Sequence, residues 1–490
     1  MAWCNVNPHI NPIRRDGIHR DPVAMSAREP LSLDLVGEPE ASAFEPSDFD
    51  FEPLPATIGR YRVIDLLGEG ATSEVFLAED DFHQQKVAIK RARAATQSKT
   101  LDNHYRGHFF AAEAALVGKL QHPNVVQIYD AVADIAQPYL VMEHVPGDTL
   151  RRYCQPDALL SLQQIVEIGF KCAMALDYVA RQGLIHRDVK PANVLVQLDK
   201  AGGLRTIKLT DFGSVFDSRS DRTQVFRVGS LAYMSPEQLD GGPQQVQTDM
   251  YGLAAVLYHL VTGRPPFDAV SQIALMNQIY HANPPLLGSL RQSVPPRLEA
   301  LVHNALAKAP KDRPATWQAF ADELALLVSN REVPVARDQD VLDSERFGFL
   351  RELEFFAHFG DIELWEVVHR GSWQRHAHGD ALYRKGDTGN SFHIIASGRI
   401  DVYRDGVRVA CLGSGASVGE MAYLAPSADM RVHRADVLVA ETATTLSFTP
   451  VTLEMLSPVS RNAFDRAFIQ VLVRRLHAAH ESMAHPRRIL

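Results

Sequence analysis

The segment from His186 to Asn193 carries residue types that suit phosphoryl transfer, since it reads His-Arg-Asp-Val-Lys-Pro-Ala-Asn. Such a transfer needs a base for a hydroxyl, a cation beside the moving group and oxygen ligands for a metal ion. Asp188 can accept or orient a hydroxyl proton, and Lys190 can contact the transferred phosphoryl group. Asn193 offers an amide oxygen to Mg²⁺. We interpret His186 as a packed structural histidine rather than an acid or base.

Other segments supply the remaining parts of such a site. The run Gly68-Glu69-Gly70-Ala71-Thr72-Ser73-Glu74-Val75 lies between two predicted strands, where backbone N–H groups of a glycine hairpin can cover phosphates. Lys90 follows on the next predicted strand, and Glu113 on a later predicted helix can hold its ammonium group toward the phosphates. Asp211 opens Asp211-Phe212-Gly213, where a carboxylate at a glycine turn suits a metal ion that bridges two phosphates.

Three further polar residues have positions that indicate structural roles. Asp249 opens an apolar helix and is expected to tether the catalytic segment, His186–Asn193. Arg313, in Asp312-Arg313-Pro314, is a candidate buried partner for Glu237, in Ser235-Pro236-Glu237. We therefore expect these residues to hold the catalytic segment rather than to take part in its chemistry.

The elements that must position these residues change in character near Gly147. Before it, the pattern predicts one helix at Phe109–Leu120 and strands at Tyr61–Leu67, Val75–Ala78, Val87–Lys90, Val125–Tyr129 and Tyr139–Glu143. After it, Ser161 is a plausible N-cap, and helices are predicted from 162 and at 248–262, 271–281, 297–308 and 316–329. The first lobe is thus mainly β and the second mainly α.

With these motifs in place, residues 60–327 resemble the eukaryotic-like serine/threonine protein kinases of bacteria. One residue departs from the kinase pattern, because Ser73 replaces the third glycine of the loop. The resemblance implies a two-lobed fold with ATP and Mg²⁺ (or Mn²⁺) between the lobes, and Lys190 matches the serine/threonine pattern. It also implies ATP contacts from Gly68, Gly70, Val75, Ala88, Lys90 and the hinge backbone near Glu143 and Val145.

An activation loop is a further implication of the resemblance. Arg187 precedes Asp188, and in kinases of this kind that arginine often meets a phosphorylated loop. The candidate acceptors are Ser218, Ser220 and Thr223, of which we favour Thr223. A phosphate between Arg187 and loop arginines could order the segment.

A second group of candidate residues lies among the glycine turns that predict a small β roll over 380–448. Gly419 to Leu424 reads as a turn into a short helix whose N–H groups can hold an anion. Arg434 can add a bidentate phosphate contact, and Glu420 can accept a hydrogen bond from a ribose hydroxyl. Arg431 is the alternative phosphate ligand.

Residues 346–480 resemble cyclic-nucleotide-binding domains, on the basis of the glycine turns, Gly419-Glu420-Met421-Ala422 and Arg434-Ala435. The resemblance implies that Glu420 holds the ribose, that Gly419, Met421 and Ala422 give backbone contacts, and that Arg434 and Ala435 bind the cyclic phosphate. Ala435 lacks the hydroxyl often seen in cyclic-GMP binders, which favours cyclic AMP over cyclic GMP. The alternative is a roll that binds no nucleotide and mediates only contacts.

Composition sets further bounds on the protein. Of its 490 residues, 46% are hydrophobic, which suffices for globular cores, and a net charge of −9 argues against nucleic-acid binding. Four cysteines without a CxxC pair indicate reduced thiols in the cytoplasm. No signal peptide is recognised, and the longest apolar stretch, Met250–Thr262, is too short to span a membrane.

Together these patterns predict an α+β protein. Its segments are a disordered acidic, proline-rich tail (1–57), a kinase domain (58–329), a linker (330–345), a cyclic-nucleotide-binding domain (346–482) and a short tail (483–490). We expect a cytoplasmic serine/threonine kinase regulated by cyclic nucleotide, acting on unidentified protein substrates, with a homodimer as one arrangement. The alternatives are a catalytically silent nucleotide-sensing scaffold and an active kinase whose roll only docks or dimerises.

Overall fold

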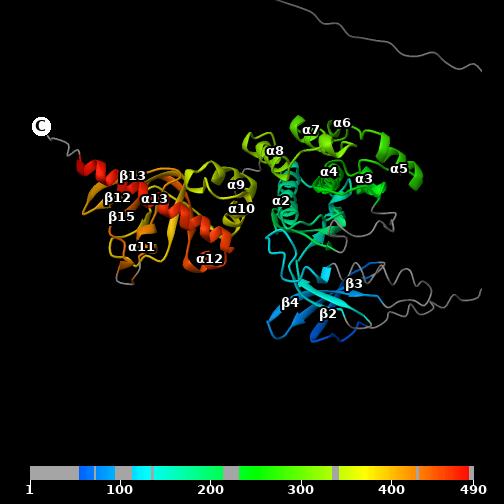
Figure 1. The fold of residues 1–490 in the computed structure, drawn as a ribbon, viewed down its shortest axis with the longest axis horizontal. Coiled ribbons are helices and arrows are strands. Elements are labelled where there is room, and N and C mark those ends of the chain that lie inside the picture. Colours follow the sequence, from blue (N-terminus) through cyan, green and yellow to red (C-terminus); the bar gives the residue numbers. More distant parts are fainter. Residues whose placement is uncertain are drawn as a thin grey trace, which may run out of the picture. The chain divides into compact units, whose positions relative to one another are not determined.

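The fold is seen in a computed structural model, which describes residues 54–70, 73–93, 113–133, 137–212, 231–333, 342–425, 427 and 430–484. Figure 1 labels its helices and strands. The candidate phosphorylation sites Ser218, Ser220 and Thr223 lie outside the described residues, as does most of the predicted N-terminal tail.

The first lobe is an antiparallel sheet with the strand order β1–β2–β3–β4–β6–β5. Its strands are β1 (Thr57–Ile58), β2 (Tyr61–Glu69), β3 (Ser73–Asp80), β4 (Gln85–Ala92), β5 (Ile128–Val132) and β6 (Tyr139–Glu143). Val87 and Ile89 of β4 belong to the buried core of this sheet. Because side chains alternate along a strand, Ala88 and Lys90 point to the opposite face, where Lys90 stands opposite Val75.

Two predicted elements of this lobe differ in their bounds from the residues that the structure describes. The structure describes residues 113–120 of the helix predicted at Phe109–Leu120, and of these residues 113 and 114 are helical while 115–119 form turns. Gly118 has a φ of 70°, the left-handed conformation at which helices often end. The strand predicted at Val125–Tyr129 is shifted to Ile128–Val132, and Val125 forms a single parallel bridge to Leu209 instead.

The second lobe is built on helices α2 (Leu162–Arg181), α4 (Val246–Thr262) and α8 (Trp317–Ser329). Around them lie α3 (Pro236–Leu239), α5 (Gln272–His281), α6 (Leu287–Leu290), α7 (Pro296–Ala305) and the strands β7 (Asp148–Thr149), β8 (Val194–Leu198) and β9 (Leu204–Leu209). The predicted helices are confirmed to within three residues at either end, and Ser161 caps α2 by accepting from the backbone N–H of Gln164 at 3.2 Å.

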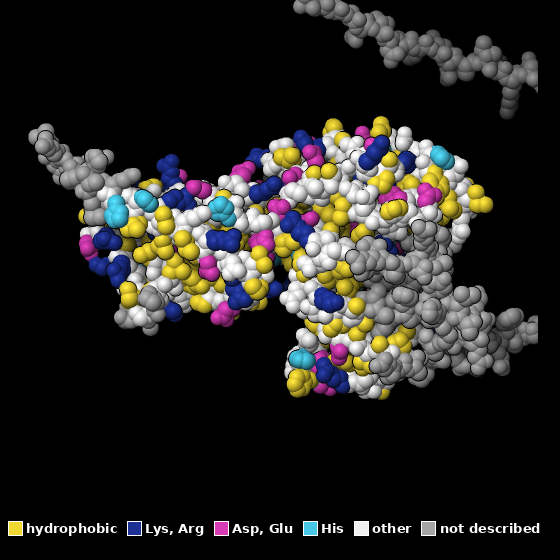
Figure 2. Space-filling model, in the orientation of Figure 1, with side chains coloured by type: hydrophobic (Ala, Val, Ile, Leu, Met, Phe, Trp, Pro, Cys, Tyr) yellow, Lys and Arg dark blue, Asp and Glu magenta, His cyan; other side chains and the backbone are white. Residues whose placement is uncertain are grey.

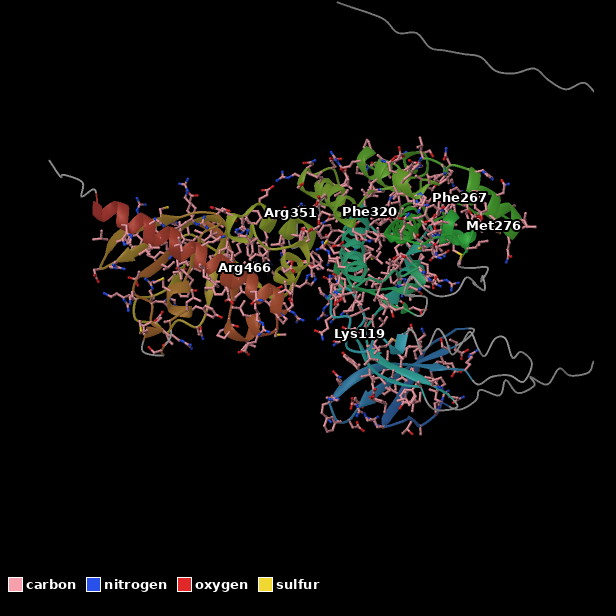
Figure 3. All side chains as sticks on the ribbon, viewed as in Figure 1. Lys119, Phe267, Met276, Phe320, Arg351 and Arg466 are labelled. Atoms are coloured by element: carbon pink, nitrogen blue, oxygen red, sulfur yellow. The ribbon has the colours of Figure 1, made fainter. Side chains whose placement is uncertain are left out.

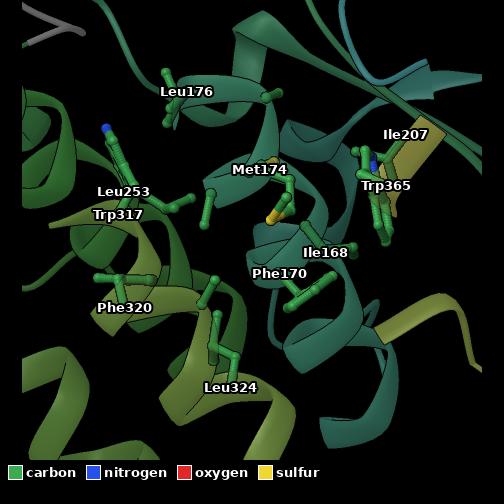
Figure 4. Close-up of a cluster of buried hydrophobic side chains, with 14 of the residues drawn as sticks. Ile168, Phe170, Met174, Leu176, Ile207, Leu253, Trp317, Phe320, Leu324 and Trp365 are labelled. Atoms are coloured by element: carbon green, nitrogen blue, oxygen red, sulfur yellow. The ribbon is translucent and has the colours of Figure 1, made fainter. Parts of the chain in front are cut away.

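Close packing of α2 on α4 and α8 depends on Gly169. A Cβ at this position would lie 3.0 Å from a methyl carbon of Leu257 and 3.1 Å from one of Leu324, so a larger residue would have to push these leucine methyl groups aside. Figure 4 shows the core that results, with α2 side chains such as Phe170 and Met174 among residues of neighbouring elements.

The C-terminal module begins with helices α9 (Asp343–Glu352) and α10 (Asp361–Arg370), joined by the short helix η6 (Glu354–Phe356). The roll that follows comprises β10 (Ser372–His376), β11 (Ala381–Tyr383), β12 (Phe392–Arg404), β13 (Val407–Leu412), β14 (Ser417–Val418), α11 (Glu420–Tyr423) and β15 (Asp436–Phe448). Helices α12 (Pro450–Glu454) and α13 (Pro458–Ala484) close it. The α+β fold expected from the sequence is thereby confirmed.

Charged side chains of both signs lie at the surface of the molecule. Figure 2 shows basic and acidic side chains intermixed on the face in view. An example is Arg351 of α9, labelled in Figure 3, which donates to Asp322 of α8 at 2.5 Å. Among the described residues, no helix has both the length and the apolar content that a membrane span would need.

Candidate functional site

Lys90 of β4 lies between two carboxylates. Its Nζ is 2.8 Å and 2.9 Å from the two carboxylate oxygens of Glu113 and 2.8 Å from Oδ1 of Asp211. The Glu113 side chain is 5% exposed, whereas that of Asp211 is 41% exposed. The predicted Lys90–Glu113 pair is therefore formed, with Glu113 buried behind the ammonium group and Asp211 on its accessible side.

The ammonium group of Lys90 and the carboxylates of Glu113 and Asp211 shift one another's pKa. Burial alone would lower the pKa of Lys90, but the carboxylates of Asp211 and Glu113 raise it above its usual value. Burial raises the pKa of Glu113 to about 7, against the opposing effect of Lys90. Burial would also raise the pKa of Asp211, but the nearby Lys90 holds it below the usual range. Lys90 is thus charged at neutral pH, and Asp211 is ionised as a metal ligand must be.

The catalytic segment places three predicted residues within hydrogen-bonding distance. Lys190 Nζ donates to Oδ2 of Asp188 at 2.6 Å. Asn193 Nδ2 donates to the same oxygen at 2.9 Å and to the Asp188 carbonyl at 2.8 Å. With Oδ2 engaged twice, Oδ1 is the Asp188 oxygen suited to a hydroxyl proton, and the Oδ1 of Asn193 is left for a metal. The hard oxygens of Asn193 and Asp211 fit Mg²⁺.

Asp249, in the first turns of α4, anchors the backbone of this segment by hydrogen bonds. Its carboxylate accepts from the backbone N–H of His186 at 2.8 Å and from that of Arg187 at 2.7 Å. Arg187 has a φ of 67°, and the tether favours this unusual backbone conformation. His186 is fully buried and its Nε2 lies 3.1 Å from the carbonyl oxygen of Thr210, as a structural histidine would.

The Glu237–Arg313 pair is formed as the sequence predicted. Arg313 donates to both carboxylate oxygens of Glu237, at 2.7 Å and 2.8 Å, and the hydroxyl of Thr248 donates to the same group at 2.9 Å. Sequence reasoning missed Gln238, whose Nε2 donates to the Arg187 carbonyl at 2.7 Å. The pair and its neighbour thus brace the catalytic segment without contacting the reacting groups.

The predicted ATP contacts lie on the strands around Lys90. Gly68 stands opposite Val75, and the loop between β2 and β3 is closed by a hydrogen bond of 2.7 Å from the Gly70 N–H to the Ser73 carbonyl. At the end of β6, the Glu143 N–H donates to the Gln127 carbonyl at 2.9 Å.

The side chain of Glu143 is also engaged, since its carboxylate accepts from Lys208 at 2.7 Å. The hydrogen bond that we expect between Glu143 and adenine would therefore go to its carbonyl oxygen. Val145 follows β6, so it also has the position expected of a hinge residue.

In the roll, Gly419 and Glu420 occupy the turn into α11. Gly419 has a φ of 87°, and a Cβ there would lie 2.5 Å from the hydroxyl oxygen of Tyr383. Glu420 is 1% exposed, and its Oε1 accepts from Arg475 of α13. Among the described residues, Oε2 of Glu420 is buried without a hydrogen-bond partner. A buried carboxylate oxygen of this kind is an acceptor that a ligand hydroxyl would satisfy.

The other predicted residues of the roll lie on the two ends of the same loop. Gly389 lies between them, because its N–H donates to the Arg431 carbonyl at 2.7 Å and a Cβ added to it would lie 2.3 Å from the Cβ of Ala422. Arg431 turns toward its own loop and donates to the Ala425 carbonyl at 3.2 Å. Arg434 is exposed and forms no ion pair with the described residues. This difference favours Arg434 over Arg431 as the phosphate ligand.

The remaining two predicted ligand residues, Met421 and Ala435, differ in their exposure to solvent. Met421 is exposed and Ala435 is half-buried beside Arg434. Arg475 was missed by sequence reasoning, because nothing in the pattern of α13 marks one arginine as the partner of Glu420.

Comparison with known families agrees with this geometry. Residues 61–324 match the family described as protein kinase domain. Residues 373–456 match the family described as cyclic nucleotide-binding domain. The two matches cover the two candidate sites, one each.

Bacterial kinases are among the curated relatives. The serine/threonine-protein kinase PknB of Mycobacterium leprae is 35% identical over 281 residues, covering 56% of this chain and 43% of that protein. PrkC of Bacillus subtilis is 33% identical over 291 residues, covering 59% of this chain and 42% of that protein. The chain thus spans less than half the length of these relatives. Since the kinase match alone takes in more than half of the 490 residues, the chain belongs to the protein kinase family.

Proposed function

We propose that this protein is a serine/threonine kinase that transfers the γ-phosphoryl group of ATP to hydroxyl groups of protein substrates. The observation that carries the proposal is the position of Lys90 between Glu113 and Asp211. All groups needed for phosphoryl transfer are present on the chain, which favours an active enzyme over a catalytically silent scaffold.

In this proposal Asp188 acts on the substrate hydroxyl, and Lys190 acts on the transferred phosphoryl group. The oxygen of the substrate hydroxyl forms a bond to the γ-phosphorus, the bond from that phosphorus to the bridging β–γ oxygen breaks, and ADP leaves with the electron pair. The hydroxyl proton moves to Oδ1 of Asp188, because Oδ2 is held by Lys190 and Asn193. Lys190 Nζ lies 2.6 Å from that carboxylate, so its charge is close enough to contact the transferred phosphoryl group.

Lys90 and the metal ligands act on the phosphates. Lys90 is held by Glu113 in a fixed position, from which its charge can neutralise phosphate oxygens. Asn193 and Asp211 would hold Mg²⁺ (or Mn²⁺), which when bound neutralises the charge that builds up on the phosphate oxygens.

Incorporation of labelled phosphate from ATP tests this proposal. Lys90→Met and Asp188→Asn are each expected to lower the rate by about 100-fold or more, the usual scale for loss of such groups. Lys86→Met is the matched control, because Lys86 lies on the same strand but is exposed. Equal labelling in Lys90→Met and the wild type would contradict the proposal.

We also propose that the roll binds a cyclic nucleotide, with cyclic AMP favoured, and that binding changes the kinase rate. The buried Oε2 of Glu420 supports this ligand, since it lacks a partner among the described residues and suits a ribose hydroxyl. The exposed Arg434 supports a phosphate contact. In this arrangement Gly419, Met421, Ala422 and Ala435 line the phosphate end of the pocket.

Calorimetric titration of the full chain with cyclic AMP and with cyclic GMP tests binding and preference separately. Arg434→Ala is expected to weaken binding at least tenfold, because a charge-assisted bidentate contact is lost. Arg431→Ala should have a smaller effect. Kinase rates with and without saturating ligand then test regulation, and equal rates would remove that part of the proposal.

A docking or dimerisation role of the roll is a second candidate, supported by an exposed apolar stripe on α13. Figure 2 shows hydrophobic side chains over the part of the surface that contains this helix. The exposed members are spaced by three or four residues on one helical face, and they are Ile469, Leu472, Val473 and Leu476. Arg434→Ala would favour this candidate if it abolished nucleotide binding while kinase regulation stayed intact. A homodimer, the protein substrates and a cytoplasmic location remain predictions.

A further inference from the structure

Trp365 of α10 makes a buried hydrogen bond to the kinase lobe, by which we mean residues 61–324, the match to the protein kinase family. Its side chain is 0% exposed, and its Nε1–H donates at 2.9 Å to Oδ1 of Asn124, which is 3% exposed and lies 241 residues earlier. An indole N–H buried so deeply would otherwise lack a partner. The bond therefore fixes both side chains in one arrangement.

Asn124 in turn holds β9, the strand that leads to Asp211. Its Nδ2 donates to the Ile207 carbonyl at 2.9 Å, and its own carbonyl accepts from the Leu209 N–H at 2.8 Å. Asp211 follows Leu209 by two residues and has a φ of 65°, a conformation that must be held by its surroundings. Figure 4 shows Trp365 and Ile207 in the same region of the core.

Helix α9 is anchored to helix α2 of the kinase lobe by buried charges. Glu167 of α2 accepts from the Ser344 hydroxyl at 2.5 Å and from the Asp343 N–H at 3.2 Å. Lys171, one turn further along α2, lies 3.0 Å from the Asp343 carboxylate. These are specific, fully engaged polar contacts rather than a loose apolar patch.

Aromatic packing fixes α10 in the same place. Phe170 of α2 packs edge-on against Trp365, with ring centroids 5.2 Å apart, and against Phe347 of α9 at 5.5 Å. On α10 the next residue, Glu366, accepts at 2.7 Å from the Ser457 N–H, close to the start of α13. Helix α10 is therefore held by the kinase lobe through Trp365 and by the roll through Glu366.

We propose that Trp365 is a positioning residue for the metal-binding carboxylate of Asp211, acting through Asn124 and β9. In this assignment, a helix that precedes the roll completes the support of the kinase site. The inference rests on the proposed metal-dependent binding of ATP by Asp211. It assigns no chemical step to Trp365, which reaches Asp211 through Asn124 and β9.

The test compares the affinity of the full chain for ADP in excess Mg²⁺ with its affinity for ADP in EDTA, measured by calorimetry. Trp365→Phe removes the N–H but keeps an aromatic ring. It is expected to lower the magnesium-dependent gain in affinity about fivefold, as expected for loss of one buried hydrogen bond, while the affinity for ADP in EDTA stays the same.

Two control variants separate positioning from general loosening. Trp373→Phe makes the same change at a tryptophan whose N–H donates to Val368 inside the C-terminal module, at 3.3 Å. Phe347→Leu removes a ring that packs against both Phe170 of α2 and Trp365, but it keeps the N–H of Trp365 and its bond to Asn124. Both controls should keep the magnesium-dependent gain within about twofold.

The assignment is overturned if Trp365→Phe keeps the gain of the wild type, or if Phe347→Leu loses as much of it. A wild type that binds magnesium-ADP yet transfers no phosphate would contradict the proposed kinase activity alone, because this measurement does not need turnover. A wild type whose ADP affinity does not respond to magnesium would contradict the assignment.

Discussion

Arg475 of α13 and Glu420 of α11 form an ion pair at the turn that carries the predicted nucleotide ligands. Arg475 also donates to the Ser417 carbonyl at 2.9 Å, so it ties α13 to both sides of the turn. Glu420 is almost fully buried, and Arg475 balances its charge. A ligand hydroxyl that reaches Glu420 would therefore share its carboxylate with Arg475.

Arg475→Ala is predicted to destabilise the roll and to make it more responsive to ligand. Removing the arginine leaves a buried carboxylate without its cation. Because Arg475 is itself 44% exposed, we expect a loss of only about 1–2 kcal/mol in the free energy of unfolding. Cyclic AMP would then add donors to a carboxylate that has fewer. The rise in melting temperature on adding cyclic AMP should be larger in the variant.

The control for this prediction is Arg474→Ala. Arg474 pairs with Glu354, and both side chains are exposed, so its loss should change the melting temperature little. Equal ligand-induced shifts in Arg475→Ala and the wild type would show that Arg475 and the ligand do not share Glu420.

The activity of the kinase lobe is predicted to depend on the ionisation of Glu113. Burial raises its pKa to about 7, so the carboxylate is ionised above that pH and increasingly protonated below it. Only the ionised form holds Lys90 fully by charge. We therefore expect kcat/KM for ATP to rise with pH through about 7 and then level off.

Glu113→Gln separates this ionisation from that of ATP itself. The variant should have a lower kcat/KM, and the part of the pH dependence that belongs to the enzyme should be absent. If Glu113→Gln keeps the full rise seen in the wild type, the titrating group lies elsewhere.

Arg313→Met is predicted to destabilise the second lobe strongly. The side chain of Arg313 is fully buried, and its loss would leave Glu237 as an uncompensated buried charge. Such losses cost about 3–5 kcal/mol, which urea unfolding can measure. Arg297→Ala, which breaks partly exposed pairs with Glu323 and Glu332, should cost about 1 kcal/mol or less.

The effect of Arg313→Met should also depend on pH. Burial would raise the pKa of Glu237, but the hydrogen bonds from Arg313 hold it below its usual value. A depressed pKa gives stability that is present above the unfolded value of about 4.3 and is lost as pH falls through the folded value. The difference between variant and wild type should thus shrink in acid. A constant difference would indicate that lost packing, not charge, explains the destabilisation.

Much of the kinase site follows from the sequence because its partners lie in motifs with fixed roles. The string from His186 to Asn193 turns back on itself, so Lys190 and Asn193 meet Asp188 over two and five residues. The pairs of Lys90 with Glu113 and of Arg313 with Glu237 are longer in sequence but join motifs that the family pattern marks.

The contacts that join the C-terminal module to the kinase lobe could not be predicted from the sequence. Trp365 sits on the apolar face of an ordinary amphipathic helix, and its periodicity does not show that its N–H reaches Asn124. One signal was available: Glu167 and Lys171 lie one turn apart on an otherwise buried helix, where unpaired charges would be costly. That pattern indicates a polar partner, but it cannot tell that the partner is α9.

The last prediction concerns Gly419, at the turn into α11. Gly419→Ala adds two penalties, the left-handed φ of 87° and a Cβ that would lie 2.5 Å from the hydroxyl oxygen of Tyr383. The second cannot be relieved without moving Tyr383 or the turn that carries Glu420. We expect the variant to lose the rise in melting temperature that cyclic AMP causes in the wild type.

Gly406→Ala is the matched control for Gly419→Ala. Gly406 also has a left-handed φ, of 81°, but a Cβ there would meet nothing within 4 Å. Its replacement should cost about 1 kcal/mol for the backbone conformation alone and leave the response to cyclic AMP unchanged. If both variants keep that response, the turn at Gly419 tolerates displacement and cannot be the part of the roll that fixes the ligand. If only Gly419→Ala loses it, the loss reflects the contact with Tyr383, since the backbone penalty is common to both.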